Sequence, residues 1–450
     1  MSELRDYQAR CIDITINSLK QGIYRQLISL PTGSGKTVIF ANLIPMIPSP
    51  NPQATKVLVL AHRLELIEQA RDQILRFNPD LVVDVEQGYQ ESLSLSPDVV
   101  VASILSLTST DGQGTKGHRL QKLNPKEFKA IIVDEAHHGV SKSYKTIFDY
   151  FGVLKRNSTT LLWGCTATPT RTDKQSLTPI FGPVLYSVNM MELINNGFLS
   201  DMQIVTAKTN EQLEVNTYYK FVVDKWMQFA LPQHRKSTLV FVKKLQDIPI
   251  ICRAFNDAGF QSINSVTQDT EPSKRETVMN DFKNGALSIL VNCEIFIEGV
   301  DLPQVDCILL TRKTKSPAFL YQMIGRGSRL HPGKSDCLVI DFQTNFERLI
   351  HDIFNNTEDD PEELQNGWFS KKQLRLWKAG EDLGAEHYDE NDVEISQYNS
   401  IQEMIQTDSV TKHRVERNDN ESTAPIISAA TSLFDVINDC IEALSNIRLQ

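Results

Sequence analysis

The sequence predicts an α/β protein made of two tandem lobes, each a parallel sheet with helices on both faces. Short apolar runs rich in Val, Ile and Leu recur along the chain and alternate with stretches of helical character. Strands that are apolar along their whole length are typical of parallel sheets buried on both faces. Because the alternation starts a second time near residue 200, two lobes explain it with the fewest assumptions.

The first lobe is expected to span residues 1–198. Its strands are predicted at 27–30, 57–61, 99–102, 130–133 and 161–165. Residues 64–77 place apolar side chains at helical spacing, and residues 38–44 form a second, largely apolar helical stretch. A small element at 190–196 closes this lobe.

The second lobe is expected to span residues 199–345. Its strands are predicted at 239–242, 263–266, 289–292, 307–310 and 338–341, with helices at 250–258 and 272–283. The chain changes character after this series, so residues 346–450 form a separate region.

That C-terminal region is predicted to be mainly helical and partly disordered. Residues 379–425 are polar, acidic and poor in apolar anchors, whereas 432–449 read as an amphipathic helix. Trp368 and Trp377 flank lysines; base stacking is one reading, and a helix that packs its tryptophans into a core is favoured.

Composition excludes several classes of protein. The chain has 450 residues, 41% of them hydrophobic, without an apolar run long enough to span a membrane, so no membrane partner is expected. The N-terminus shows no secretory or transit pattern. Seven scattered cysteines without a C-x-x-C pair indicate reduced, buried thiols rather than disulfides or a zinc site.

The net charge of −10 is unevenly distributed. Residues 351–450 carry 21 acidic and 8 basic residues, a net of −13, and the first 350 residues carry 35 acidic and 38 basic residues, a net of +3. The acidic tail is therefore the source of the overall charge, and the two lobes are free to approach a polyanion.

The segment Leu30–Thr37, LPTGSGKT, has the composition of a phosphate-binding loop between a strand and a helix. Glycines allow tight turns whose N–H groups point at an anion, and the helix N-terminus adds positive potential. Its lysine would reach the β- and γ-phosphates, and the last threonine would hold Mg²⁺. The alternative is an ordinary Gly-rich turn, and Leu30 departs from the usual first glycine. The nucleotide-binding residues expected here are Thr32, Gly33, Ser34, Gly35, Lys36 and Thr37.

Two adjacent carboxylates, Asp134 and Glu135, end the apolar strand of IIVDEAHH. Ligands of open α/β sheets bind at that end of a strand. Asp134 is suited to Mg²⁺ and Glu135 to deprotonating an attacking water, although such a pair alone is more often a helix cap. The neighbouring His137 and His138 also suggest a metal site, but they are adjacent and lack a second ligand cluster.

The phosphate loop and the Asp-Glu-Ala-His sequence together resemble the superfamily 2 helicases and nucleic-acid translocases. Other motifs of that family match in order between residues 3 and 345. The resemblance implies two RecA-like lobes with ATP and Mg²⁺ between them and nucleic acid across their joint face. It assigns adenine recognition to Arg5 and Gln8 and further nucleotide contacts to Gly299 and Asp301.

The same resemblance assigns nucleic-acid contacts to His62, Arg63 and Ser103. Simpler roles stay open, since Arg63 could solvate a helix start and Ser103 could be a capping hydroxyl.

Thr166, Thr168 and Gln322 are assigned to coupling between hydrolysis and movement. Local capping by the two threonines is an equally good reading, and one residue can do both.

Arg326 and Arg329, in QMIGRGSR, resemble the arginine fingers of the family. Arginines on the second lobe can stabilise charge on a transferring phosphoryl group only when the lobes close, which couples hydrolysis to motion. In isolation, a basic helix start would be the better reading of this segment. With these two arginines, the expected catalytic residues are Lys36, Glu135, Arg326 and Arg329.

Within the superfamily, the chain is most similar to duplex-DNA translocases and restriction-type enzymes, in particular the fungal mitochondrial branch-migration helicases, which are double-stranded-DNA-dependent ATPases. This resemblance implies a monomeric, DNA-stimulated ATPase that remodels duplex, forked or branched DNA in mitochondria, with the nucleus or cytoplasm as alternatives. An RNA helicase and a nucleotide-dependent scaffold are the competing hypotheses.

Overall fold

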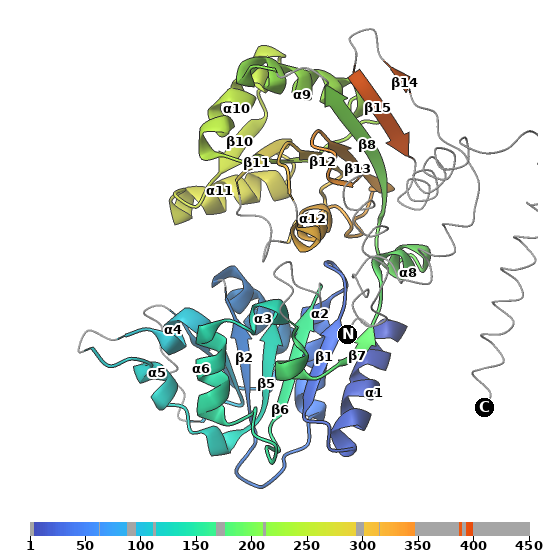
Figure 1. The fold of residues 1–450 in the computed structure, drawn as a ribbon. Coiled ribbons are helices and arrows are strands. Elements are labelled where there is room, and N and C mark those ends of the chain that lie inside the picture. The colour runs from blue at the N-terminus through green and yellow to red at the C-terminus, as the bar shows by residue number, and fades with distance from the viewer. Residues whose placement is uncertain are drawn as a thin grey trace, which may run out of the picture.

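The computed structural model describes residues 4–62, 64–87, 96–110, 114–167, 176–209, 213–293, 301–314, 316–346, 387–388 and 393–398. Its two α/β lobes lie one above the other in Figure 1, with the N-terminal lobe below. The expected fold of two tandem lobes built on parallel sheets is confirmed.

The first lobe is a seven-stranded parallel sheet with the order β3-β4-β2-β5-β6-β1-β7. Its central strands are buried along almost their whole length, which explains their apolar composition. The strands are β1 (Arg25–Ser29), β2 (Lys56–Ala61), β3 (Val83–Glu86), β4 (Val99–Ser103), β5 (Phe128–Asp134), β6 (Leu161–Thr166) and β7 (Val184–Ser187).

Most helices of the first lobe lie between successive strands, with α1 before the first strand and α8 after the last. The helix expected at 64–77 is present with those bounds, because its apolar side chains recur at helical spacing. The α-helices are α1 (Asp6–Lys20), α2 (Lys36–Leu43), α3 (Leu64–Phe77), α4 (Ile104–Thr108), α5 (His118–Gln121), α6 (Lys142–Phe151), α7 (Thr178–Phe181) and α8 (Met190–Asn195).

The second lobe is an eight-stranded sheet with the order β10-β11-β9-β12-β13-β8-β15-β14. The six strands from β10 to β8 are parallel, and β15 and β14 continue the sheet antiparallel. They are β8 (Asp201–Thr209), β9 (Thr238–Phe241), β10 (Ile263–Val266), β11 (Ile289–Asn292), β12 (Cys307–Leu310), β13 (Asp336–Asp341), β14 (His387–Tyr388) and β15 (Val393–Tyr398). Its α-helices are α9 (Val215–Phe229), α10 (Ile248–Asp257), α11 (Pro272–Lys283) and α12 (Pro317–Ile324).

Strands β14 and β15 are elements that the sequence did not predict. At least part of residues 379–425 is expected to be loop or disorder, and within this range β15 pairs with β8 from Val393↔Thr209 to Tyr398↔Ile204. A strand added at a sheet edge is held by main-chain hydrogen bonds, so a polar sequence can supply it without the apolar pattern of a central strand. The helices expected around Trp368 and at 432–449 lie outside the described residues.

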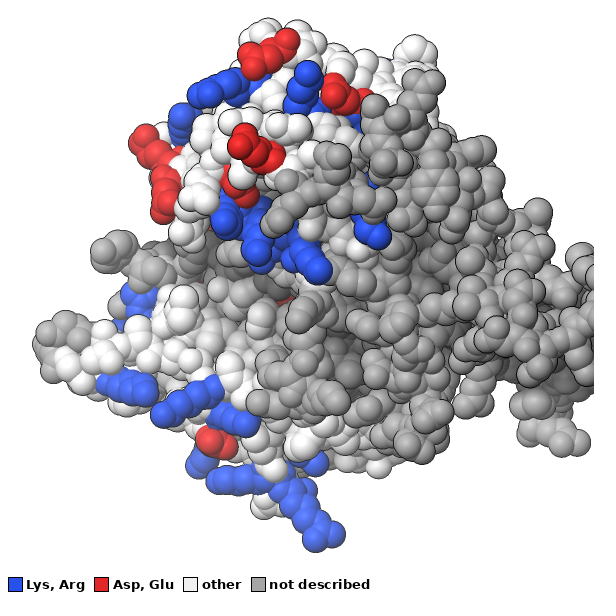
Figure 2. All heavy atoms as spheres, turned by 45° about the horizontal axis from the view of Figure 1, so that its top comes forward, with Lys and Arg blue, Asp and Glu red and all other residues white. Residues whose placement is uncertain are grey.

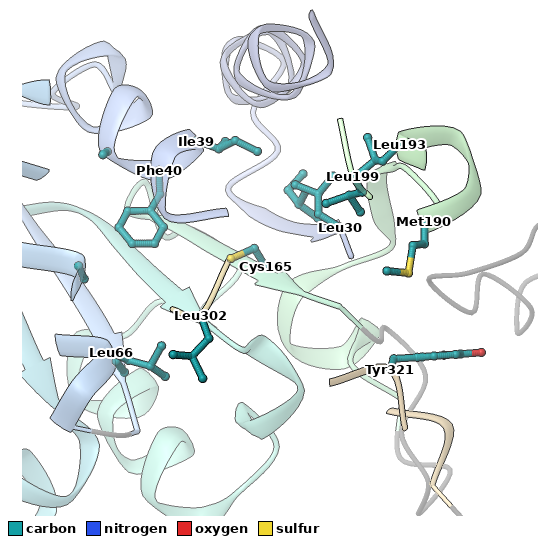
Figure 3. Packing of buried hydrophobic residues seen from close by; sticks show 14 of the residues in the cluster. Leu30, Ile39, Phe40, Leu66, Cys165, Met190, Leu193, Leu199, Leu302 and Tyr321 are labelled. Atoms are coloured by element: carbon teal, nitrogen blue, oxygen red, sulfur yellow. The ribbon is translucent and has the colours of Figure 1, made fainter. Parts of the chain in front are cut away.

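One apolar cluster runs through both lobes. It includes Leu30 and Leu66 of the first lobe together with Leu302 and Tyr321 of the second, all at most 9% exposed. Figure 3 shows Leu302 of the second lobe next to Leu66 and below Cys165 of the first lobe, with Leu30 and Tyr321 farther to the right. The two lobes therefore share buried apolar contacts as well as a polar cleft.

Other expectations concern membranes and cysteines. Among the described residues, no helix is both long and apolar enough to span a bilayer. The six described cysteines are free thiols, and five of them are buried.

Candidate active site

A single cleft between the lobes brings together most of the residues that the sequence singled out. Lobe 1 supplies the phosphate loop and the acidic pair, and lobe 2 supplies the two arginines. The expected site residues that line it are Arg5, Thr32, Gly33, Gly35, Lys36, Thr37, Asp134, Glu135, Asp301, Arg326 and Arg329.

The phosphate loop has the backbone that anion binding needs. Gly33 and Gly35 have φ values of 85° and 78°, a region that side chains disfavour, and Gly35 is the N-cap residue of α2. The buried hydroxyls of Thr32 and Ser34 have no hydrogen-bond partner among the described residues. Unpaired buried hydroxyls beside a helix N-terminus fit the oxygen-rich phosphates of a nucleotide.

Helix α1 holds this loop from behind. The Tyr7 hydroxyl donates to the Ser34 carbonyl at 2.5 Å, and Gln8 Nε2 donates to the same oxygen at 3.0 Å. Arg5 donates to the Phe198 carbonyl at 3.0 Å and lies 5.3 Å from the centroid of its ring. The expected adenine-reading segment therefore joins the phosphate loop to the chain that enters lobe 2.

The acidic pair ends β5 in a strained turn. Glu135 has φ 50°, a left-handed conformation that is uncommon for a residue with a side chain and that clusters at functional sites. Its N–H donates to Asp134 Oδ1 at 3.0 Å. Lys36 Nζ lies 3.2 Å from Glu135 Oε1, so the loop lysine and the acid already face each other.

Burial and charge act against each other in this cluster. Burial raises the pKa of Asp134, and the neighbouring Glu135 raises it further. Burial alone would lower the pKa of Lys36, but the carboxylates of Glu135 and Asp134 outweigh it and raise that pKa. Two buried carboxylates beside one ammonium leave an excess of negative charge that a cation would offset.

The residues fit a magnesium ion bound with a nucleotide. Mg²⁺ prefers oxygen ligands and usually takes only one or two protein groups together with water and phosphate oxygens. The Asp134 carboxylate and the Thr37 hydroxyl line the same cleft and supply that type of donor.

The arginine segment of lobe 2, residues 325–329, follows α12 and packs directly on the phosphate loop. Ser328 Oγ lies 3.5 Å from the Thr32 carbonyl oxygen, and a Cβ built on Gly33 would come within 3.4 Å of Arg329 Cγ. Arg326 is 4% exposed, and Arg329 forms an ion pair with Asp301. Arg329, an expected catalytic arginine, and Asp301, an expected nucleotide contact, are thus mutually paired.

Three imidazole rings contact one another next to the acidic pair, with tilts of 49° between His62 and His138 and 42° between His137 and His138. The ring centroids of His62 and His138 are 4.3 Å apart, and those of His137 and His138 are 4.1 Å apart. His137 Nδ1 lies 3.0 Å from Thr166 Oγ1 and 3.4 Å from Glu135 Oε2. A continuous contact path therefore joins His62, an expected nucleic-acid residue, to the acid of the cleft.

A metal centre at these histidines gains no support from the geometry. Among the described residues, no cluster of three or more His, Cys, Asp or Glu side chains could hold a metal ion. The rings instead contact one another, which gives adjacent histidines a role without a metal.

The remaining expected residues fall into two groups. Ser103 is 3% exposed and precedes α4 as its N-cap residue, so its hydroxyl is turned away from solvent in this structure. Gln322 is 5% exposed on α12. The roles of both stay predictions. Arg63, Thr168 and Gly299 lie outside the described residues.

Sequence reasoning missed several residues around the cleft. Cys165 Sγ lies 3.5 Å from Asp134 Oδ1, and Gln69 and Gln73 of α3 line the opening. None of them belongs to a motif with an evident phosphate or metal chemistry. The sequence feature that could have pointed to Cys165 is its position at the end of a predicted strand, next to Thr166.

The surface view places basic side chains beside the space between the lobes. In Figure 2, Lys and Arg gather in one group on the upper lobe next to the hollow and in a row along the lower lobe. This distribution suits contact with a phosphate backbone.

Two family models match the chain in the order of its lobes. Residues 1–171 match "Type III restriction enzyme, res subunit", and residues 222–331 match "Helicase conserved C-terminal domain". Each lobe is therefore similar to a domain family, the first to a restriction-enzyme subunit and the second to the C-terminal domain of helicases.

Individual proteins are similar over most of this chain. The "Putative ATP-dependent helicase IRC3" of Saccharomyces cerevisiae is 35% identical, covering 75% of this chain and 51% of that protein. The "Putative mitochondrial ATP-dependent helicase irc3" of Schizosaccharomyces pombe is 32% identical, covering 82% of this chain and 62% of its own length. The chain thus spans between half and two thirds of these relatives.

A solved structure shares the fold. A fragment of a putative HsdR subunit of a type I restriction enzyme from Vibrio vulnificus YJ016 has a TM-score of 0.60 at 22% identity. The match covers 81% of this chain and 67% of that one.

Proposed function

We propose that this chain hydrolyses ATP in the cleft between its lobes and uses the energy to move along or remodel duplex, forked or branched DNA. One observation carries the proposal: the phosphate loop and the acidic pair of lobe 1 line the same cleft as Arg326 and Arg329 of lobe 2. Catalysis of phosphoryl transfer consists of positioning and electrostatic stabilisation, and this cleft offers both.

Each of the cleft residues of lobe 1 has its own role in the reaction. The phosphate-loop N–H groups and Lys36 bind the triphosphate, and Thr37 with Asp134 would hold Mg²⁺, which neutralises phosphate charge when bound. Glu135 accepts the proton of the attacking water. Lys36, now paired with Glu135, turns to the phosphate, which leaves the carboxylate available as the base.

Lobe 2 completes the site. In this structure Arg329 is paired with Asp301. As the lobes close, Arg329 turns toward the nucleotide and, with Arg326, stabilises charge on the transferring phosphoryl group. Product release lets the lobes separate again, so that alternating contacts with the phosphate backbone produce movement.

Double-stranded DNA is favoured as the partner by the relatives. The restriction-enzyme family model and the HsdR fragment belong to restriction enzymes by their names, whereas the names of the two yeast relatives, both ATP-dependent helicases, do not state which nucleic acid they act on. The basic side chains beside the hollow suit a backbone contact of either DNA or RNA.

Mitochondrial localisation rests on resemblance to the S. pombe relative, which is named as mitochondrial. A monomeric state remains part of the proposal. Localisation is tested by fractionation of cells that express the tagged protein. The monomeric state is tested by light scattering of the purified protein with and without DNA.

The deciding experiment is an ATPase panel. Hydrolysis by the wild type is measured without nucleic acid, with duplex DNA, with a DNA fork and with single-stranded RNA, and Glu135→Gln serves as the inactive control. We expect the strongest stimulation by duplex or forked DNA and loss of hydrolysis in the control. Stimulation by RNA alone would replace the DNA proposal with an RNA helicase, and the absence of any hydrolysis would support a scaffold.

A further inference from the structure

The arginine segment is held at nearly every backbone carbonyl. Ser328 Oγ donates to the Gly325 carbonyl at 2.9 Å, and the Ser328 carbonyl accepts from the Ser200 N–H at 2.7 Å. Ser200 lies next to β8, the strand that enters lobe 2. The segment is therefore fixed from the side of the interlobe connection.

One lysine holds the segment from the opposite side. Lys334 Nζ donates to the Gly327 carbonyl at 2.5 Å and to the Arg329 carbonyl at 2.9 Å. The first of these carbonyls follows Arg326 by one residue, and the second belongs to Arg329 itself. An ammonium group is suited to this contact because its tetrahedral donors can reach two oxygens at once.

The lysine is held close to the interior rather than pointing into solvent. Burial lowers the pKa of Lys334, and the two carbonyl oxygens are hydrogen-bond acceptors for its partly buried ammonium group. Close packing limits the segment further, because a Cβ on Gly327 would lie 2.2 Å from Cys337 Sγ. The backbone at Gly327 is therefore confined between the sulfur and the ammonium.

We propose that Lys334 is a positioning residue for the two arginines: it fixes the carbonyls of Gly327 and Arg329 and so sets the direction in which Arg326 and Arg329 extend into the cleft. The inference rests on the proposed hydrolysis. Lys334 is absent from the walls of the cleft and acts through the backbone that carries the arginines.

The test compares two variants. Lys334→Met has a side chain of similar length but no hydrogen-bond donors, whereas Lys334→Arg keeps the positive charge and the donors. Lys283→Met, at an exposed position of α11 in the same lobe, is the matched control. For each protein, ATP turnover with duplex DNA, affinity for a fluorescent ATP analogue and melting temperature are measured.

We expect Lys334→Met to lower turnover about tenfold or more while its nucleotide affinity stays within about threefold of the wild type. Lys334→Arg should recover a substantial part of the turnover, and Lys283→Met should behave as the wild type. A loss of nucleotide affinity equal to the loss of turnover, or unchanged turnover in Lys334→Met, would overturn the positioning role.

A second measurement does not depend on hydrolysis. Hydrogen–deuterium exchange of the segment 325–329, without nucleotide, should be faster in Lys334→Met than in the wild type and in Lys334→Arg. Unchanged exchange would refute the proposal even if the wild type proved inactive, whereas an inactive wild type with faster exchange in Lys334→Met would refute the proposed function alone.

Discussion

The Nζ atom of Lys36 lies 3.2 Å from Oε1 of Glu135, so the lysine that should bind phosphate and the acid that should activate water form a buried ion pair. Both side chains are about one tenth exposed, and Asp134 lies beside them. This pair makes nucleotide binding and stability depend on the same residues.

Replacing Lys36 should destabilise the folded protein as well as prevent nucleotide binding. In Lys36→Met two buried carboxylates lose their counter-ion, and we expect the free energy of unfolding to fall by about 3 kcal/mol. Urea denaturation at neutral pH measures this change. The double variant Lys36→Met/Glu135→Gln should recover part of the loss because one carboxylate is removed; a double variant no more stable than Lys36→Met would argue against the ion pair.

Glu135→Gln should separate binding from hydrolysis. The amide keeps the shape of the side chain but cannot accept a proton, and we expect turnover to fall by roughly 10²–10⁴. Affinity for ATP with Mg²⁺ should be retained. Turnover close to that of the wild type would remove Glu135 from the role of general base.

Gly325→Ala should interfere where the lobes meet. A Cβ at this position would lie 2.6 Å from Thr32 Cβ on the opposite lobe and 2.8 Å from the Tyr321 carbonyl oxygen. Relieving such overpacking costs about 1–3 kcal/mol. We expect reduced turnover and a lower melting temperature, with ATP binding to lobe 1 largely retained; normal turnover would show that the lobes need not pack this closely for catalysis.

His138 should affect stimulation by nucleic acid through ring contact. Its ring lies between those of His62 and His137, the latter within 3.4 Å of Glu135. In His138→Ala we expect the stimulation of ATPase activity by duplex DNA to be lost, and His138→Phe, which keeps a ring, to recover part of it. If duplex DNA stimulated both variants as strongly as the wild type, the contacts of the three histidine rings would not couple DNA binding to ATP hydrolysis.

Much of the fold could be predicted because most of its strands are largely apolar. The strands expected at 289–292 and 307–310 coincide with the fully buried β11 and β12, and the strand expected at 263–266 coincides with β10, of which only Val266 is buried. Strand β15 could not be predicted, since it joins the sheet next to its edge, between β8 and β14, and a strand held there by main-chain hydrogen bonds needs no apolar pattern.

The site was predictable where a residue type has one evident chemistry. Lys36, Asp134 and Arg329 belong to motifs whose spacing indicates phosphate chemistry, and the structure places all three around one cleft. The contacts of Lys334 with the arginine segment and of His62 with His138 are tertiary contacts between different segments, and the spacing within a motif does not indicate them. Such contacts become visible only once the backbone is placed.

The central claim is that each lobe supplies half of one catalytic site, and Arg329→Ala tests it most directly. Single-turnover ATP hydrolysis with duplex DNA is compared with ATP affinity for the wild type and this variant. We expect affinity to be nearly unchanged and the rate to fall by about 10³-fold or more, as for other arginines that stabilise phosphoryl transfer. An unchanged rate would contradict the claim, because lobe 1 would then suffice for catalysis.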